Sequence, residues 1–277
     1  MLYQLPVTYL DGFKYHVCGC AVDGGDLRET ENPSALRGCS KDIMSEMTPL
    51  ELKLRGFIQQ KDRNYFVVRI KTQLGNVNSE QLAVLSDLAR KYGRGYMTFT
   101  ARMNIEIPWV AQENLPAVQK AVEEVGLNVG GTGPRVRPIV ACKGTVCKNG
   151  LVDTQSLGRM LDERFFGRDL PAKFKIGITG CQNDCAKAEI NDLGFVGRRS
   201  SETKGERGYA AYFGGTFGKV HREGRQAGPL LSEEEAVALT GRVLDYMEKN
   251  ALPKERLGML INRLGWVEFL NAIGLTP

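Results

Sequence analysis

Two pairs of closely spaced cysteines lie in the second half of the chain. Cys142 and Cys147 occur in ACKGTVCKNG, and Cys181 and Cys185 occur in GCQNDC. Thiolates in such pairs are ligands for zinc or for iron–sulfur clusters, and the neighbouring glycines let the backbone approach the sulfur atoms closely. The spacing alone leaves three interpretations open: a [4Fe–4S] cluster, a zinc ion, or buried cysteines that hold no metal.

Three more cysteines, Cys18, Cys20 and Cys39, occur near the start of the chain. Together with His16 they supply enough ligands for a second metal site, and free or redox-active thiols are the alternative. The first residues contain no basic stretch followed by an apolar run, so no signal peptide is predicted and we expect a cytoplasmic location. In a reducing compartment, cysteines indicate metal ligands or reactive thiols rather than disulfides.

Composition narrows the classes of partner. The chain has 277 residues, a formal net charge of +5 and 42% hydrophobic residues, which is typical of a globular protein with more than one domain. No run approaches the roughly eighteen apolar residues of a transmembrane helix, and no nucleic-acid-binding motif surrounds the scattered basic residues. We expect neither a membrane nor a nucleic acid as a partner. The basic excess reflects either ordinary solubility or an anionic ligand.

The elements that precede the cysteines alternate between helix and strand. The hydrophobic periodicity predicts a helix over 48–60, a strand over 65–72, a helix over 79–93 with Ser79 as its N-cap, one or two strands over 96–110 and a helix over 113–126. Strands and helices in this order are typical of a ferredoxin-like α+β unit.

The glycine-rich stretch at 130–138 is a break and a plausible domain boundary. Beyond it the patterns predict helices over 154–167 and 232–250, a helical pair over 255–274, and strands over 173–180, 192–197 and 209–215. We therefore expect an α+β fold with an N-terminal extension over 1–55, a ferredoxin-like domain over 56–130 and an α/β domain over 131–277 that holds the two cysteine pairs.

Four segments of this sequence resemble the sulfite and nitrite reductase haemoprotein family. They are LPAKFKIGITGCQNDCAKAEINDLGFVG, FTARMNIEIPWV, GPRVRPIVACKG and YFGGTFGKV, and the similarity extends over about residues 55–275. The resemblance implies that the α/β domain binds sirohaem and a [4Fe–4S] cluster. It also implies that Cys142, Cys147, Cys181 and Cys185 hold the cluster, and that the sulfur of Cys185 bridges to the haem iron.

The same resemblance assigns cationic side chains to a substrate oxyanion. The matching positions are Arg102, Arg137, Lys173 and Lys175, with Arg135 as a competitor for Arg137. Lys173 and Lys175 are two residues apart on a predicted strand, so both side chains should point to one face. Arginine binds an oxyanion through paired donors, and lysine can serve as a point charge or a proton source. A solvated strand face is the alternative for the two lysines.

The carboxylates of a sirohaem need basic side chains and backbone N–H groups. The candidates are Arg63, Arg69, Lys71, Arg135, Lys143, Arg198 and Lys219, with the amides of Gly214, Gly215 and Gly218. Neither His16 nor His221 is expected to have a role in sirohaem chemistry.

The activity implied is the six-electron reduction of sulfite to sulfide. Nitrite reductases of the family tend to carry Asn at the position of Lys175, and a second cation suits doubly charged sulfite better than nitrite. Nitrite reduction, a haem-less [4Fe–4S] electron-transfer subunit and a zinc-stabilised binding module are the alternatives.

The family's module occurs once in this sequence, whereas larger members contain two copies. A homo-oligomer or a paralogous partner subunit is therefore expected to complete the site. The eight-cysteine ferredoxin domain that some short members contain does not occur in the sequence. We expect an external one-electron donor, ferredoxin-like or other.

Overall fold

The structure, a computed structural model, describes residues 44, 46–200 and 205–276, which all lie in one compact unit of the chain, Cys39–Pro277. The predicted second metal site at His16, Cys18, Cys20 and Cys39 lies outside the described residues. No helix among the described residues is long and apolar enough to span a membrane.

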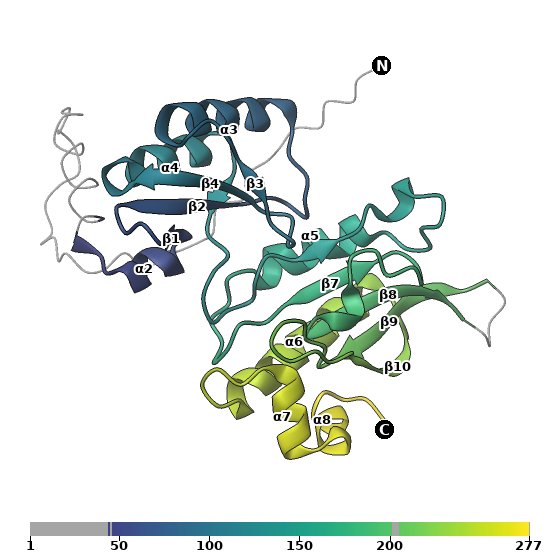
Figure 1. The fold of residues 1–277 in the computed structure, drawn as a ribbon. Coiled ribbons are helices and arrows are strands. Elements are labelled where there is room, and N and C mark those ends of the chain that lie inside the picture. The colour runs from purple at the N-terminus through teal and green to yellow at the C-terminus, as the bar shows by residue number, and fades with distance from the viewer. Residues whose placement is uncertain (1–43, 45, 201–204, 277) are drawn as a thin grey trace, which may run out of the picture. The chain divides into compact units, whose positions relative to one another are not determined.

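The first half of the described chain forms an antiparallel sheet covered by two helices (Figure 1). Strand β2 (Tyr65–Lys71) lies between β1 (Phe57–Gln59) and β4 (Ile105–Ala111); β3 (Thr98–Phe99) pairs with β4, and β5 (Asn128–Val129) pairs with β2. Alternate residues of β2 are buried, because successive side chains of a strand point to opposite faces. The helices α3 (Ser79–Tyr92) and α4 (Leu115–Glu124) pack their apolar sides onto this face.

Two details of this half differ from the sequence prediction. The predicted helix over 48–60 ends early: α2 (Pro49–Leu54) is followed by the strand β1. Gly56 separates them with φ at +103°, a conformation that only glycine adopts easily. The N-cap of α3 is Asn78 rather than Ser79, because the Asn78 side chain accepts a hydrogen bond from the amide of Gln81 at 2.8 Å.

The second half is built on a mixed sheet with the strand order β10-β9-β8-β7-β6. Three strands run parallel to one another: β6 (Val140–Ala141), β7 (Ile176–Thr179) and β8 (Leu193–Arg199). Strand β9 (Arg207–Phe213) pairs antiparallel with β8, and β10 (Arg225–Leu231) pairs antiparallel with β9. Strand β10 was not predicted, since its sequence RQAGPLL contains glycine and proline. Both residues are tolerated here because β10 is an edge strand.

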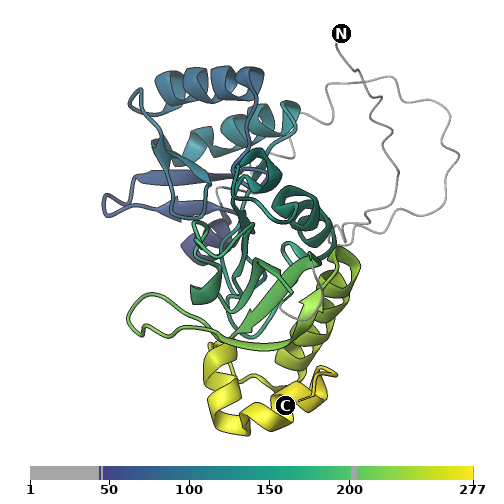
Figure 2. The ribbon, with the colours of Figure 1, turned by 90° about the vertical axis from the view of Figure 1, so that its right-hand side faces the viewer.

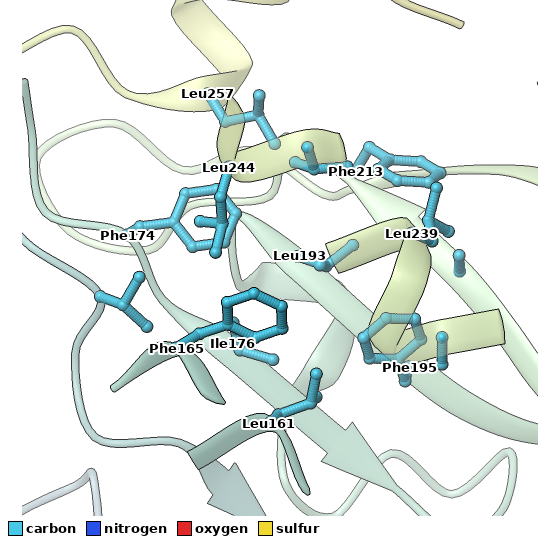
Figure 3. Close-up of a cluster of buried hydrophobic side chains, with 14 of the residues drawn as sticks. Leu161, Phe165, Phe174, Ile176, Leu193, Phe195, Phe213, Leu239, Leu244 and Leu257 are labelled. Atoms are coloured by element: carbon cyan, nitrogen blue, oxygen red, sulfur yellow. The ribbon is translucent and has the colours of Figure 1, made fainter. Parts of the chain in front are cut away.

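One face of this sheet is covered by helices. Helices α5 (Thr154–Phe165) and α6 (Glu233–Asn250) pack against the strands and each other, and α7 (Leu257–Leu264) and α8 (Trp266–Ala272) follow (Figure 2). Figure 3 shows the core between them, where labelled side chains of α5, α6, α7 and the strands gather. Each large apolar side chain buried in this core contributes about 1.5–3 kcal/mol.

The opposite face of the second sheet carries the short helix η3 (Ala188–Ile190) and the loop before it. The predicted fold class, an α+β protein with a ferredoxin-like unit followed by an α/β domain, is confirmed. The division of the chain at 55/56 and 130/131 stays a prediction.

Candidate cluster and anion-binding site

The loop that contains Cys181 and Cys185 lies between two close backbone contacts with the strand β8. A Cβ atom added to Gly194 would overlap the carbonyl oxygen of Ala188, and one added to Gly197 would overlap that of Gly180. These two glycines of β8 therefore let Gly180 and Ala188, on either side of the loop, approach closer than any side chain would permit.

Asp184 fixes the shape of this loop. Its backbone is left-handed, with φ at +43°, and its carboxylate accepts hydrogen bonds from the amides of Ala188 at 2.7 Å and Glu189 at 3.3 Å. The amide of Ala186 donates to the Thr179 hydroxyl at 3.1 Å. Because the loop is held from both sides, Cys181 and Cys185 are presented at its two ends.

Cys142 of the first pair contacts the residue directly before Cys181. The sulfur of Cys142 accepts hydrogen bonds from the amide of Gly180 at 3.1 Å and from that of Gly144 at 3.5 Å. A Cβ atom on Gly150 would overlap the carbonyl oxygen of Gly144, so this loop is also folded tightly on itself. Backbone donors to a cysteine sulfur are the partners that stabilise and tune a metal-bound thiolate.

The cysteines differ in exposure: Cys142, Cys147 and Cys181 are half-buried and Cys185 is exposed. Within the described residues, no three His, Cys, Asp or Glu side chains gather closely enough to hold a single metal ion. Two touching loops that carry two thiols each, with amide donors to sulfur, fit a [4Fe–4S] cluster.

Two cavities meet at Cys185. The first, of about 590 Å³, is called here the Cys185 cavity, and it is lined by Arg102, Lys175, Cys185, Lys187, Asn191, Phe217 and His221 among others. The second, of about 610 Å³, is lined by both Cys142 and Cys185, and by Lys143. Cys185 thus faces the other cysteine loop on one side and a cationic cavity on the other.

Arg102 reaches from the turn before β4 to the second sheet. Its guanidinium donates to the carbonyl oxygens of Pro138 at 2.6 Å and Ile176 at 3.0 Å, and to the side-chain oxygen of Asn191 at 2.8 Å. Burial, above all, lowers the pKa of Arg102 to about 10, which leaves the group charged at neutral pH. Arg102 therefore joins the two halves of the structure and adds a fixed positive charge to the cavity wall.

Lys173 and Lys175 flank the buried Phe174 just before β7, which begins at Ile176, and they line different cavities. Burial is the main reason that the pKa of Lys175 is lowered to about 8. The nearby positive charges lower it further, and they come from Arg102, Arg256 and Lys173. The negative charge of Asp192 partly opposes this shift. The pKa of Lys173 is also lowered, mainly by burial. A lysine with such a pKa can hold a proton at pH 7 and still release it.

Anion binding in the Cys185 cavity is expected to weaken as the pH rises through about 8. Below this value the Lys175 ammonium is charged and attracts the anion, and above it the group is neutral. The KM for nitrite, which stays singly charged throughout, measures the effect between pH 6.5 and 9.5. Lys175→Arg is the matched control, because arginine stays protonated and should flatten the profile. A rise in KM of the same size in both proteins would contradict the assignment.

The structure does not bring all four predicted oxyanion ligands into one cavity. Arg137 and Lys173 line a separate cavity of about 480 Å³, together with Lys53, Lys254 and Arg256. Arg137 donates to the Gly133 carbonyl at 2.9 Å, and its Nε is buried without a hydrogen-bond partner. Burial, above all, lowers the pKa of Arg137 to about 10. Arg135 points elsewhere and pairs with Asp169 at 3.0 Å.

The sequence did not predict the ion pair between Asp192 and Arg256, which lies close to these cations. The carboxylate of Asp192 is fully buried and accepts two hydrogen bonds from Arg256, at 2.8 and 2.6 Å. It also accepts from the amide of Lys175 at 2.7 Å, which fixes that residue's backbone. The one available signal was an aspartate at the start of the apolar segment DLGFVG. Its partner lies 64 residues away along the chain.

Several predicted sirohaem contacts have protein partners in this structure. Arg69 pairs with Glu106 at 2.6 Å, Lys71 pairs with Asp162, and Arg198 donates to the Tyr212 hydroxyl at 2.9 Å. Arg63 and Lys219 are exposed, the former in a turn. The charges of Arg69 and Lys71 are matched by Glu106 and Asp162, which disfavours both as cofactor contacts.

The predicted glycine turn lies beside the Cys185 cavity. Gly214 has φ at +82°, and a Cβ atom on Gly215 would overlap the carbonyl oxygen of Glu189, which precedes β8. Gly218 lies between Phe217 and His221, whose side chains line the cavity and meet edge to face with ring centres 5.2 Å apart. His221 is therefore closer to the site than the sequence predicted.

Comparison with known proteins identifies the family. A model described as the nitrite and sulphite reductase 4Fe-4S domain matches residues 132–276, and the nitrite/sulfite reductase ferredoxin-like half domain matches residues 58–125. An assimilatory-type sulfite reductase of Nitratidesulfovibrio vulgaris is 29% identical over 213 residues, which cover 76% of this chain and 93% of that protein. A nitrite reductase [NAD(P)H] of Bacillus subtilis is 30% identical over 208 residues, covering 74% and 24%.

The solved structure of the Mycobacterium tuberculosis NirA protein has the same fold, with a TM-score of 0.73 at 19% identity. The match covers 87% of this chain and 49% of that one. This chain thus spans most of the Nitratidesulfovibrio relative, but about half or less of the other two proteins. Because the two family models together account for nearly all residues from 58 onward, the chain belongs to the nitrite and sulphite reductase family.

Proposed function

We propose that this protein is a sirohaem-dependent reductase that converts sulfite to sulfide. The observation that carries the proposal is the Cys185 cavity, where a cluster-type cysteine lies in the same wall as Arg102 and Lys175. An electron-transfer protein needs the cysteine, but it has no use for cations around a cavity beside it. A thiolate next to an anion-binding wall is what the reduction of an oxyanion requires.

The residues that line the two cavities at Cys185 include the proposed ligands of the cofactors. The four cysteines Cys142, Cys147, Cys181 and Cys185 would hold a [4Fe–4S] cluster, and Cys185 is the one that also faces the cationic cavity. When bound, a sirohaem joined to such a cluster supplies electrons one at a time to the substrate. Lys143, Arg198, Lys219 and the amides of Gly214, Gly215 and Gly218 remain our proposed contacts for its carboxylates.

The side chains of the cavity supply charge and protons. Arg102 holds a fixed charge, because its hydrogen bonds to Pro138, Ile176 and Asn191 prevent it from moving. Lys175 binds the anion as a cation. With a pKa of about 8 it can also give a proton to an oxygen that leaves as water. Each oxygen lost from the substrate consumes protons, so a donor that is readily reprotonated suits the chemistry.

Sulfite is favoured over nitrite by Lys175, because a doubly charged anion gains more from an additional cation. The Nitratidesulfovibrio relative, named a sulfite reductase, adds support. Nitrite is the second candidate, because the Bacillus relative is named a nitrite reductase. Both reductions take six electrons and proceed by loss of oxygen as water, so the same walls serve either substrate.

Lys175→Asn is expected to lower kcat/KM for sulfite at least about tenfold more than for nitrite. The change removes one charge-assisted hydrogen bond, which contributes about 1.5–3 kcal/mol, and the loss is greater for the more highly charged anion. Turnover of both substrates with a viologen donor measures it. Lys120→Asn, an exposed helix position, is the control. An equal loss for both substrates would remove the basis for choosing sulfite.

We further propose that a second copy of the chain, or a paralogous subunit, completes the site. The predicted oxyanion ligands divide between two cavities, and Arg137 and Lys173 line the one that contains no cysteine. Cations of one subunit could then serve the cofactors of another. A one-electron donor, ferredoxin-like or other, and a cytoplasmic location belong to the same proposal.

The test is an anaerobic visible spectrum of the purified protein, with iron, zinc and acid-labile sulfide assayed on the same sample. A haem band together with more than four irons per chain is expected. Broad cluster absorption without haem would instead indicate an electron-transfer subunit. A colourless protein with zinc would overturn the proposal.

A further inference from the structure

The hydrogen bonds of Arg102 leave little of its guanidinium free for a ligand. An arginine side chain has five N–H donors. The Nε and Nη2 atoms of Arg102 donate to the carbonyl oxygen of Pro138 at 3.1 and 2.6 Å, and Nη2 also donates to that of Ile176 at 3.0 Å. Nη1 donates to the side-chain oxygen of Asn191 at 2.8 Å. One N–H of Nη1 is therefore left without a protein partner among the described residues.

The acceptors that hold Arg102 are all neutral. Two of them are backbone carbonyl groups and the third is the amide of Asn191. Arg256, by contrast, is held by the carboxylate of Asp192. A carboxylate would cancel most of the charge of the guanidinium that it orients, whereas an amide orients the group and leaves its charge to act on an anion.

The amide of Asn191 is fixed in one orientation. Asn191 is buried, and its Nδ2 donates to the carbonyl oxygen of Lys187 at 2.6 Å, so its oxygen has to face Arg102. A Cβ atom added to Gly177 of β7 would lie 2.6 Å from this Nδ2, which shows how closely the strand packs on it. Lys187 follows Cys185 by two residues. Asn191 thus joins the guanidinium of Arg102 to the loop that contains Cys185.

We propose that Asn191 is a positioning residue that presents Arg102 to the substrate anion as a fully charged donor of a single hydrogen bond. The inference rests on the proposed function, because it takes the Cys185 cavity to be the oxyanion site. Arg102 and Asn191 both line that cavity, so the free N–H of Nη1 is the donor that an anion there can reach. The paired donors that an arginine usually offers are not available, and the second contact is left to Lys175 in the same wall.

Two substitutions separate the charge of this residue from its support of the fold. Asn191→Asp keeps an acceptor for Arg102 and nearly the same size, but it places a negative charge against the guanidinium. Asn191→Ala removes the acceptor and keeps the charge of Arg102, and water from the cavity can enter the vacated space. If Asn191 only supported the fold, aspartate would be the milder change. If its neutrality matters, aspartate is the more harmful one.

The experiment measures the Kd of nitrite by isothermal titration calorimetry on the oxidised holoprotein. No electron donor is present, so binding is observed without turnover. The variants are Asn191→Asp, Asn191→Ala, Arg102→Gln and the double variant Arg102→Gln, Asn191→Asp. The control is Asn64→Asp, which makes the same charge change in an exposed turn before β2. Iron, sulfide and haem contents and urea unfolding are compared in every protein first.

The Kd is expected to rise at least about tenfold in Asn191→Asp and less than about threefold in Asn191→Ala, with no change in Asn64→Asp. In the Arg102→Gln background, Asn191→Asp should raise the Kd by less than about threefold more, because the residue acts through the arginine. An equal effect of Asn191→Asp in both backgrounds would show that its carboxylate repels the anion directly, and would overturn the positioning role.

A greater loss in Asn191→Ala than in Asn191→Asp would also overturn the proposal, since it would mean that the side chain only supports the fold. If Asn191→Asp did not retain its cofactors, Asn191→Ala would decide. A rise in its Kd of about tenfold or more would then reject the proposal, and a rise of less than about threefold would support it. A wild-type protein that binds neither nitrite nor sulfite would reject the proposed function itself.

Discussion

Replacing Cys185 with serine is expected to lower sulfite turnover by more than about a hundredfold. Even the indirect partners of a metal ligand contribute 10- to 100-fold to affinity or activity, and Cys185 is the cysteine that lines both the cavity with Cys142 and the cavity with Arg102. Serine offers a hard, protonated oxygen in place of the soft thiolate that iron–sulfur chemistry needs. The measurement is turnover with a viologen donor, alongside the visible spectrum and the iron content.

The matched control for this prediction is Gln182→Ala on the same loop. Gln182 is exposed and lines a cavity next to Cys181, so its replacement tests whether the loop tolerates any change of side chain. Normal spectrum and turnover are expected with the viologen donor. If Cys185→Ser also turned over sulfite at the normal rate, the cysteine would have no part in the chemistry and the proposed function would fail.

Replacing Asp192 with asparagine is expected to reduce the free energy of unfolding by about 3–5 kcal/mol. Asp192 is fully buried and holds Arg256 through two hydrogen bonds. Without its charge, Arg256 is left unpaired close to Arg102, Arg137 and Lys175, with which it already interacts unfavourably. Urea unfolding followed by circular dichroism measures the loss.

Asp87→Asn is the control for the stability prediction. Asp87 pairs with Arg90 at 3.2 Å, but both side chains are more than 70% exposed, and such pairs contribute about 0–1 kcal/mol. The double variant Asp192→Asn, Arg256→Gln should recover part of the stability, because it removes the buried unpaired cation. A loss below 1 kcal/mol in Asp192→Asn would show that the buried pair does not hold this region together.

Local patterns predicted much of the fold. The alternation in YFVVRIKT identified β2, and capped amphipathic periodicity identified α3, α5 and α6. The strand predicted over 173–180 begins only at Ile176, and Lys173 and Lys175, predicted to share one face, line different cavities. Failures occurred where backbone geometry overrides composition. Gly56 ends α2 early, and β10 pairs with its neighbour despite a glycine and a proline, because an edge strand lacks one partner.

The candidate site was harder to predict, because its ion pairs join residues that lie far apart in the sequence. Lys71 is an obvious basic residue in the sequence, yet it forms an ion pair with Asp162, which lies 91 residues away and neutralises its charge. The pairing of Asp192 with Arg256 follows the same pattern. A single sequence contains no signal for such pairs. It reports which residues carry charge, but not whether the charge is already matched inside the fold.

The close contacts of Gly194 and Gly197 with the residues on either side of the Cys181–Cys185 loop have a consequence for the proposed electron transfer. On either side of the loop, at Gly180 and Ala188, its flanking backbone meets the backbone of β8 directly. Asp184 holds its other side through backbone amides. Ligands carried on such a support move little when the charge between them changes. Under the proposed function, a rigid support of this kind would keep the reorganisation energy of each single-electron step low, and the reduction of one sulfite or nitrite needs six such steps.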